Sequence, residues 1–496
     1  MKRIIYLVYI GILLVSCDYV LDVEPENNVT FTNYFETEKD VAAIVNTVHG
    51  GLRTCETRIP EREILSWVAD EYNDWSFEYV RNLSPSYYLS DENDISWRNY
   101  YGVIYNANLL IDNMYRVKEI TEERKNFYLQ QVYFAKGVAY FRIAQNFGDA
   151  PITNSSTDTK PLKKSPVEDV LAEALTYALQ AFDLPKFEDL RDENGAVISS
   201  KQYGSKGAAT ALLSNIYAWR AALNNDENDW QEAEKYCSMI IDGKVGFYDL
   251  VETPEDVCTQ VLKRNSVESI WEIQIDQIDD PMFLLPPFYI CKYLGFPLVQ
   301  GMAPNDFHYV ILKKETIRNL YGENDKRIDA YFYGMNEEYD GVEDNAFIYK
   351  WRYPIHELSE WWPEPEYKGM DVNRIVWRLA DIFLLRAECR VRLGKADAVE
   401  DLNKIRKRAG IADYSASEGD LRYAIFKERT RELIFEGQRY YDVVRNGYWK
   451  TELGPAFALL TEEDIKDGAL YLPVGWGAFN LNELMRQNTY WLKKQK

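Results

Sequence analysis

Apolar residues recur at every third or fourth position in several long stretches of this 496-residue chain, and this spacing constrains the fold more than any other feature. An α-helix turns once in about 3.6 residues, so such residues share one face, which a soluble protein buries. The clearest stripe runs through 128–147 and stops at Gly148-Asp149-Ala150-Pro151. Further stripes occupy 209–223, 230–240, 375–387 and 398–409. The sequence therefore predicts a mainly α fold.

Short turns join neighbouring stripes, which predicts helical hairpins. The stripes 209–223 and 230–240 flank an Asn- and Asp-rich turn, and small residues such as Ala208 and Ala222 permit close packing. The stripes 375–387 and 398–409 flank Gly394 and resemble a tetratricopeptide hairpin, although the 34-residue consensus of that repeat is incomplete. We expect a scaffold of such tetratricopeptide-like hairpins.

A last long helix is expected to carry Phe426, Leu433, Gly437, Tyr440 and Val444. Charged residues lie on the same segment at spacings of three and four, which allows opposite charges to pair along a helix face. Glu436 and Arg439 form one such expected pair. A charge run of this kind is typical of a solvated or fold-stabilising face, so we predict no site there.

The middle of the chain, 245–370, has a different character. It holds nine prolines, its helical periodicity fades, and apolar runs such as Ser269–Ile273 predict a few short strands. Irregular loops on a rigid scaffold often carry binding sites. No Gly-, Ser- or Pro-rich linker divides the chain. We therefore predict one compact domain over 31–496, with a helical N-terminal half (31–244), a loop-rich insert (245–370) and a helical C-terminal half (371–496).

The N-terminus is typical of a targeting signal. Lys2 and Arg3 precede an apolar run that is too short to span a bilayer as a helix, so residues 1–16 are predicted to be a signal peptide. The run ends in Leu14-Val15-Ser16-Cys17, which resembles the lipobox of bacterial lipoproteins, in which the cysteine is acylated. Residues 17–30 are polar and acidic and are expected to tether the domain to the membrane. Acidic residues at this place also resemble surface-export signals. No second apolar run of 18 residues follows.

Charge and motifs exclude several functions. The chain has 57 Lys and Arg against 79 Asp and Glu, a formal net charge of −22, which disfavours nucleic-acid binding. Its three histidines are far apart, and we find no zinc, nucleotide-binding, GxSxG or calcium-loop motif. We predict no cofactor and no metal, and structural calcium has no support. The cysteines other than Cys17 contain no CxxC pair and are expected to be mostly buried thiols: Cys55, Cys237, Cys258, Cys291 and Cys389.

Several blocks, in order, resemble the SusD/RagB family of outer-membrane nutrient-binding lipoproteins. The blocks are Tyr140-Phe141-Arg142 with Phe147-Gly148-Asp149-Ala150-Pro151, Lys206-Gly207-Ala208-Ala209, Arg378-Leu379-Ala380-Asp381 with Ala387-Glu388, Asn403 to Gly410, Glu428 to Arg439 with Asp442 and Arg445, Leu472-Pro473, and Gln487-Asn488-Thr489-Tyr490. Val474 and Thr489 depart from the family's usual Ile and Pro. The blocks span nearly the whole chain beyond the signal peptide.

The resemblance implies a SusD-like fold and a function. Members of the family are lipid-anchored on the outer membrane, exposed at the cell surface, and capture oligosaccharides. They deliver the glycan to a SusC-like TonB-dependent transporter and do not cut it. We therefore expect a glycan-binding lipoprotein and not an enzyme. Two alternatives remain open: a lipid-anchored helical-repeat scaffold without its own sugar site, and a glycoside hydrolase, because a pair of carboxylates always exists among so many acidic residues.

Sugars present flat C–H faces and a rim of hydroxyl groups, so the site should combine aromatic rings off the helical stripes with polar neighbours. The early segment 67–81 supplies Trp67, Tyr72, Asn73, Trp75 and Tyr79. The proline-rich insert supplies Tyr289 and Tyr293, and a third cluster supplies Trp361 and Trp362. Packing in the core is the alternative role for each of these aromatic residues.

Overall fold

The computed structural model describes residues 35–57, 60–93, 95–275, 295–358 and 365–495. Its N-terminal half is built on six long helices: α3 (Glu38–Glu56), α7 (Arg98–Asn113), α8 (Glu122–Phe147), α9 (Val167–Ala181), α10 (Lys206–Asn224) and α11 (Glu227–Ile241). The main helices of the C-terminal half are α16 (Leu379–Arg392), α17 (Ala398–Ala409), α18 (Leu421–Glu432) and α19 (Arg439–Asn446). The predicted helical stripes at 128–147, 209–223, 230–240 and 398–409 are confirmed.

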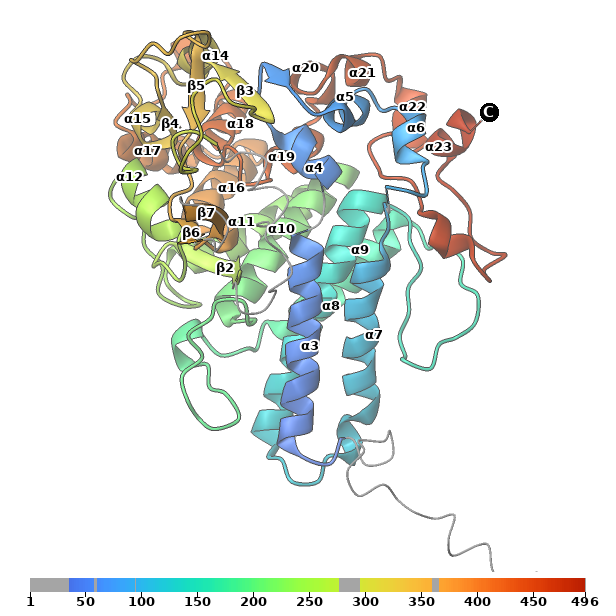
Figure 1. Ribbon diagram of the computed structural model, residues 1–496. Coiled ribbons are helices and arrows are strands. Elements are labelled where there is room, and N and C mark those ends of the chain that lie inside the picture. Colours follow the sequence, from blue (N-terminus) through green and yellow to red (C-terminus); the bar gives the residue numbers. More distant parts are fainter. Residues whose placement is uncertain (1–34, 58–59, 94, 276–294, 359–364, 496) are drawn as a thin grey trace, which may run out of the picture.

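Consecutive long helices pack against one another, from α3 through α7, α8, α9, α10 and α11 to α16 and α17. In Figure 1, α3, α7 and α8 run side by side as a long bundle whose free end holds the start of α3. Local capping sets the ends of the hairpin helices. Ser205 accepts a hydrogen bond from the Ala208 N–H at the start of α10, and Asn225 closes that helix with left-handed backbone (φ 51°, ψ 45°).

Close approach in the scaffold depends on residues without large side chains. A Cβ atom at Gly137 of α8 would lie 3.2 Å from the Ala178 amide nitrogen of α9 and 3.1 Å from Leu212 of α10. Ala208 and Ala221 on α10 are fully buried. Most of the small-residue face predicted for this hairpin therefore lies in the packed interior, while Ala222 is only half-buried.

Short helices and strands surround this scaffold. The helices are α4 (Pro60–Ser66), α5 (Trp75–Arg81), α6 (Pro85–Tyr88), α12 (Pro254–Asp256), α14 (Lys314–Tyr321), α15 (Arg327–Tyr331), α20 (Trp449–Glu452), α21 (Pro455–Ala458), α22 (Glu462–Lys466) and α23 (Thr489–Lys494). Single-turn 3-10 segments are η1 (Met114–Arg116), η2 (Phe187–Asp189), η4 (Ala416–Glu418) and η5 (Trp476–Phe479), and η3 (Val257–Val261) is a π-helix.

The strands form three small antiparallel sheets. One has four strands in the order β1 (Glu71–Tyr72), β3 (Val310–Lys313), β5 (Asn345–Ile348) and β4 (Phe332–Tyr333). The others are the pair β2 (Ser269–Ile273) with β8 (Arg374–Arg378) and the hairpin β6 (Pro354–Leu358) with β7 (Pro365–Met370). The predicted strand at 269–273 is confirmed, and most of the other strands also belong to the loop-rich insert.

Two expectations about the C-terminal half were wrong. Ile375 does not begin a helix, because 374–378 is a buried strand and α16 starts at Leu379. The expected last long helix is broken between α18 and α19, where Phe435 (φ 64°) and Gly437 (φ 80°) adopt left-handed backbone. A Cβ atom at Gly437 would lie 2.5 Å from a Glu63 carboxylate oxygen, so the turn also needs a residue without a side chain.

The charge run on α18 and α19 is buried, not solvated. Glu436 does not pair with Arg439 as expected, because its carboxylate receives Arg378 at 2.8 Å and Lys350 at 2.6 Å. Arg439 pairs with Glu452 instead. Arg378 also binds Glu432 at 2.9 Å. This network joins β8, α18 and the insert, which gives the charge run a fold-stabilising role.

Other residues in the blocks that resemble the family form similar buried pairs. Arg142 of α8 binds Glu56 of α3 through two nitrogens, at 2.9 and 3.0 Å. Arg445 of α19 binds Glu388 of α16, and Arg429 of α18 binds Asp381 of α16. Arg–carboxylate pairs with two hydrogen bonds fix orientation as well as distance. These blocks therefore hold helices together and contribute little to an exposed site.

The predicted buried thiols are confirmed for Cys55, Cys237, Cys258 and Cys389, while Cys291 lies outside the described residues. Among the helices that the structure describes, none combines the length and the apolar character needed to cross a membrane.

Candidate functional site

Strand pairing brings the early aromatic segment next to the insert. In β1 and β3, Tyr72 is opposite Val310, and the Asn73 N–H donates to the Tyr309 carbonyl at 3.0 Å. Asp70 extends the link, because its carboxylate accepts from the Lys313 N–H and from the Thr316 hydroxyl, each at 2.6 Å. Residues more than 230 positions apart thus build one surface.

Helix α5 exposes two aromatic rings on this surface. Asp74 caps the helix by accepting from the Ser76 N–H at 2.9 Å. Trp75 is 69% exposed and Tyr79 is 42% exposed. Their ring centres are 5.5 Å apart and their planes meet at 84°, so the two rings form an edge-to-face pair. We call Trp75 and Tyr79 the aromatic platform.

Phe307 was missed by sequence reasoning. It is 58% exposed, and its ring centre lies 5.0 Å from that of Tyr309, which in turn lies 6.5 Å from Phe77 of α5. The run Phe307-His308-Tyr309 in the proline-rich insert was the available signal. Phe307 comes near α5 because β1 pairs with β3, and no local sequence pattern reveals that pairing.

Trp67 supports this surface from beneath and does not lie on it. Its side chain is only 4% exposed, and its ring packs against Phe77 at 4.9 Å and stacks on Tyr72 at 6.2 Å. Tyr72 is half-buried, with the Arg81 guanidinium 4.5 Å from its ring centre. Burial raises the pKa of Tyr72, although the positive charges of Arg81 and Arg439 oppose the rise. The Tyr72 hydroxyl therefore stays protonated.

Asn73 is exposed, but its amide is already engaged in the fold, since Nδ2 donates to the His308 carbonyl at 2.7 Å. Of the predicted site residues, the structure brings together Trp67, Tyr72, Asn73, Trp75 and Tyr79, of which Trp75 and Tyr79 present exposed rings. The predicted residues Cys17, Tyr289, Tyr293, Trp361 and Trp362 lie outside the described residues.

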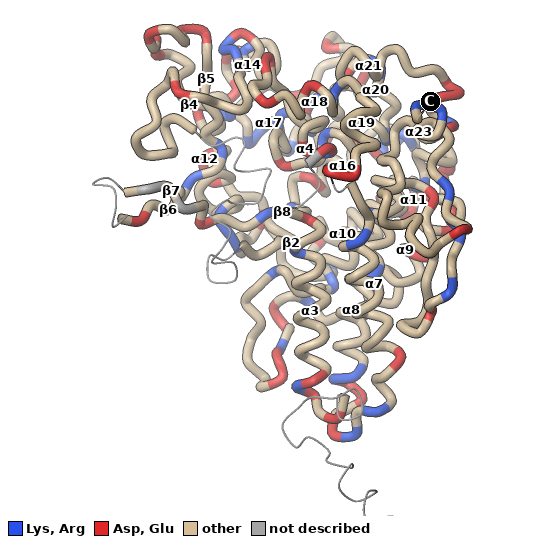
Figure 2. Tube along the Cα trace, turned by 45° about the vertical axis from the view of Figure 1, so that its right-hand side comes forward, with Lys and Arg blue, Asp and Glu red and all other residues tan. Residues whose placement is uncertain are grey.

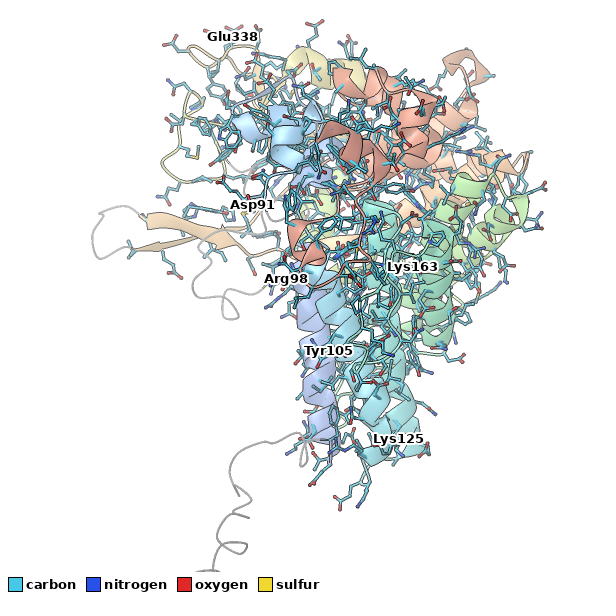
Figure 3. All side chains as sticks on the ribbon, turned by 90° about the vertical axis from the view of Figure 1, so that its right-hand side faces the viewer. Asp91, Arg98, Tyr105, Lys125, Lys163 and Glu338 are labelled. Carbon is cyan, nitrogen blue, oxygen red and sulfur yellow. The ribbon has the colours of Figure 1, made fainter. Side chains whose placement is uncertain are left out.

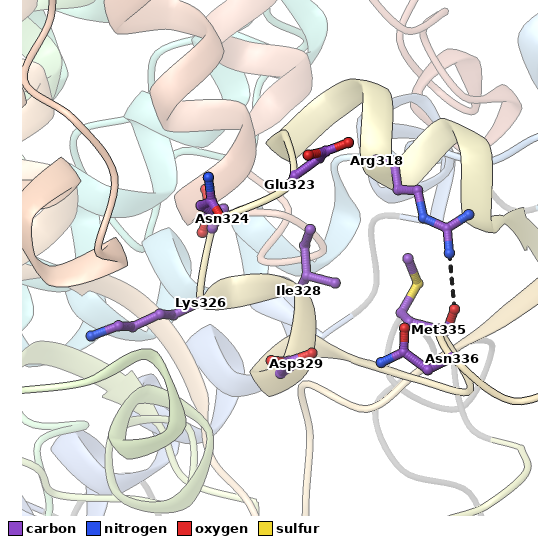
Figure 4. Close-up of a pocket in the computed structure, with 9 residues that line it drawn as sticks. Arg318, Glu323, Asn324, Lys326, Ile328, Asp329, Met335 and Asn336 are labelled. Atoms are coloured by element: carbon purple, nitrogen blue, oxygen red, sulfur yellow. Dashed lines mark hydrogen bonds between the residues drawn. The ribbon is translucent and has the colours of Figure 1, made fainter.

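A separate cavity of about 510 Å³ lies between α14 and α15 and is shown in Figure 4. Its lining is polar, with Glu323, Asn324 and Lys326 on the connecting loop and Arg318 donating to the Met335 carbonyl at 3.1 Å. No described residue that lines it has an aromatic ring. Within the described part of the chain, no three His, Cys, Asp or Glu side chains are grouped so that they could hold a metal ion.

Two family models match the sequence. The model described as SusD family matches residues 304–491, and the model described as starch-binding associating with outer membrane matches residues 19–218. Together they cover more than three quarters of the chain. SusD-like protein P25 of Formosa agariphila is 25% identical over 90% of each chain, and SusD-like protein P38 of the same organism is 23% identical over 92% of this chain and 93% of its own.

Solved structures share the fold. A SusD homolog from Bacteroides thetaiotaomicron has a TM-score of 0.74 at 21% identity, over 92% of this chain and 98% of its own. Surface glycan-binding protein A from the same organism has a TM-score of 0.67 at 19% identity, over 92% and 100%. The mainly α, tetratricopeptide-like architecture with a loop-rich insert is thereby confirmed. The chain belongs to the SusD family.

Proposed function

We propose that this protein captures an oligosaccharide on the aromatic platform at the outer surface of the cell. The proposal rests on the pair Trp75 and Tyr79, whose two aromatic rings are exposed to solvent on one face of α5. A ligand that covers one of these rings removes apolar surface from water, which stabilises the complex by about 25 cal/mol per Å² of apolar area buried. The C–H face of a sugar ring can cover such area, while the hydroxyl rim bonds to polar neighbours.

The platform is supported rigidly, as a binding site requires. Trp67 and Phe77 pack beneath it, Asp74 caps α5, and Asp70 ties β1 to α14. These contacts fix the two rings before a ligand arrives, which lowers the entropy that binding costs. The description of the family model over residues 19–218, starch-binding associating with outer membrane, supports the same role.

The proposal includes an anchor and a partner. Cys17 is the acylated residue, residues 17–30 are the tether, and a SusC-like TonB-dependent transporter receives the glycan. The start of α3 lies at the free end of the long bundle, and α5 lies at the other end of the molecule (Figure 1). A tether that precedes α3 would therefore place the platform about one bundle length away from the lipid anchor. The protein binds glycan without cutting it.

The test is retardation of the protein in native gels that contain single polysaccharides, followed by calorimetry with the matching oligosaccharide. Trp75→Ala should weaken binding about thirtyfold, because an aromatic residue at the centre of a binding surface contributes about 2 kcal/mol or more. Tyr105→Ala is the matched control, since Tyr105 is also half exposed but lies on the side of the long bundle (Figure 3). Equal binding by both variants would place the site elsewhere. Absence of binding to every polysaccharide would reject the proposal and favour a protein-binding scaffold.

A further inference from the structure

Glu78 is exposed on the same face of α5 as the two rings of the aromatic platform. It lies three residues after Trp75 and one before Tyr79, and residues three and four apart on a helix are neighbours, with Cβ atoms about 5–6 Å apart. Asn82, one turn further on, is also exposed. Glu78 therefore lies at the edge of the surface that a ligand on Trp75 and Tyr79 would cover.

The positive charges near Glu78 do not neutralise the carboxylates around it. The segment 67–82 contains four carboxylates, those of Asp70, Glu71, Asp74 and Glu78, against the single cation Arg81. Arg81 is half-buried against the Tyr72 ring. Of the nearby basic residues of β3 and α14, Lys313 partly offsets Glu71, and Lys314 is engaged elsewhere.

Of these, Lys313 donates to the Asn345 side chain at 2.9 Å and lies 3.8 Å from Glu71. Lys314 is buried and donates to the carbonyls of Glu337 and Glu343. The exposed loop between β4 and β5 adds further carboxylates, including Glu338, at the end of the molecule where α14 lies (Figures 2 and 3). Next to α5, four carboxylates therefore face the two cations Arg81 and Lys313, which leaves a net negative charge.

A carboxylate accepts hydrogen bonds and donates none, so it suits the hydroxyl groups of an uncharged sugar. It repels a uronate or a sulfate. Two like charges about 4 Å apart in water reduce affinity about fivefold, and salt screens part of this effect. A polyanionic polymer repeats its anionic group, so the carboxylates around the platform repel several of these groups at once.

We propose that Glu78 makes the aromatic platform select uncharged saccharides against polyanionic ones. This inference rests on the proposed function, since it assigns a substrate class to the same platform. It gives Glu78 the role of a specificity-determining residue at the edge of the ligand. The basis is the placement of one exposed carboxylate on the helical face that carries Trp75 and Tyr79.

The experiment compares two sets of native gels at low salt. One set contains amylopectin, xylan, galactomannan or laminarin, which are uncharged, and the other contains polygalacturonate, alginate or chondroitin sulfate. We expect the wild-type protein to be retarded in at least one gel of the first set and in none of the second. Glu78→Gln should lower the ratio of the dissociation constant for a polyanion to that for a neutral polysaccharide by up to about fivefold, and Glu78→Lys should lower it further. High salt should reduce both effects.

Glu193→Gln is the matched control. Glu193 is exposed in the turn 192–196, next to Arg191, whose carbonyl accepts from Arg124 near the free end of the bundle. Two results would overturn the selectivity while leaving the glycan-binding role intact. One is retardation of the wild type by a polyanion that is lost in Trp75→Ala. The other is a ratio of the two dissociation constants that does not change in Glu78→Lys. Retardation in neither set would reject the glycan-binding role and this inference with it.

Discussion

Replacement of Glu388 by glutamine tests whether buried ion pairs hold the scaffold together. Glu388 lies on α16 and accepts from Arg445 of α19 at 2.9 and 2.7 Å and from the Asn446 amide at 3.2 Å. Burial alone would raise the pKa of this carboxyl. The positive charges of Arg445 and Arg392 outweigh burial and lower the pKa from 4.5 to about 2.

The size of the effect follows from that pKa. A folded-state pKa below the unfolded value means that the ionised carboxylate stabilises the folded protein. The difference between 4.5 and about 2 corresponds to about 3 kcal/mol, which is fully present above pH 4.5 and is lost as the pH falls toward 2. At pH 7, Glu388→Gln should therefore reduce the free energy of unfolding by about 3 kcal/mol. At pH 3.5 the gap between wild type and variant should be smaller by about 1 kcal/mol.

The assay is urea unfolding followed by tryptophan fluorescence at both pH values. The difference between wild type and variant isolates Glu388 from the other carboxyls that titrate in this range. Glu122→Gln is the control, because Glu122 is exposed and pairs only with Lys125 of its own helix among the described residues, so it should leave stability unchanged. A gap that is absent at pH 7, or that stays constant down to pH 3.5, would refute the reasoning.

Two further predictions concern packing and thiols. Gly207→Ala would place a Cβ atom against the Tyr248 hydroxyl and should reduce the free energy of unfolding by about 1–3 kcal/mol, whereas Gly50→Ala, with open space around its Cβ in α3, should be neutral or stabilising in the same denaturation assay. Burial raises the pKa of the Cys237 and Cys258 thiols to about 12 and raises that of Cys55 and Cys389 well above its usual value, so a thiol reagent should label none of the four in the native protein and all of them in urea. Labelling of these four at the rate of a free thiol in the native state would contradict their burial.

The helical scaffold was predictable because its signal is local. A period of 3.6 residues is present within each segment, and some segments add a capping residue and a closing glycine, as in α8, which begins after Thr121 and ends at Gly148. The strand at 374–378 was misread because all five of its residues are buried, so its apolar run continued the stripe of α16. The break before α19 was missed because Phe435, a residue that rarely adopts left-handed backbone, takes that conformation through tertiary packing.

The site was predictable in part for the same reason. Trp75 and Tyr79 lie four residues apart off any apolar stripe, so their exposure follows from local pattern. The burial of Trp67 and the proximity of Phe307 depend on β1 meeting β3, a contact between distant segments. The resemblance pointed to the family, but its blocks mark buried ion pairs and say nothing about the rings that meet a ligand.

The pairing of β1 with β3 also orders events during folding. The N-terminal half leaves the ribosome with α5 already in its sequence, but the strand that supports α5 follows more than 230 residues later. Contacts between such distant segments form slowly, because a long loop must close before they can stabilise anything. The aromatic platform is therefore a surface that the chain completes late, and a nascent or truncated chain that lacks β3 carries Trp75 without that support.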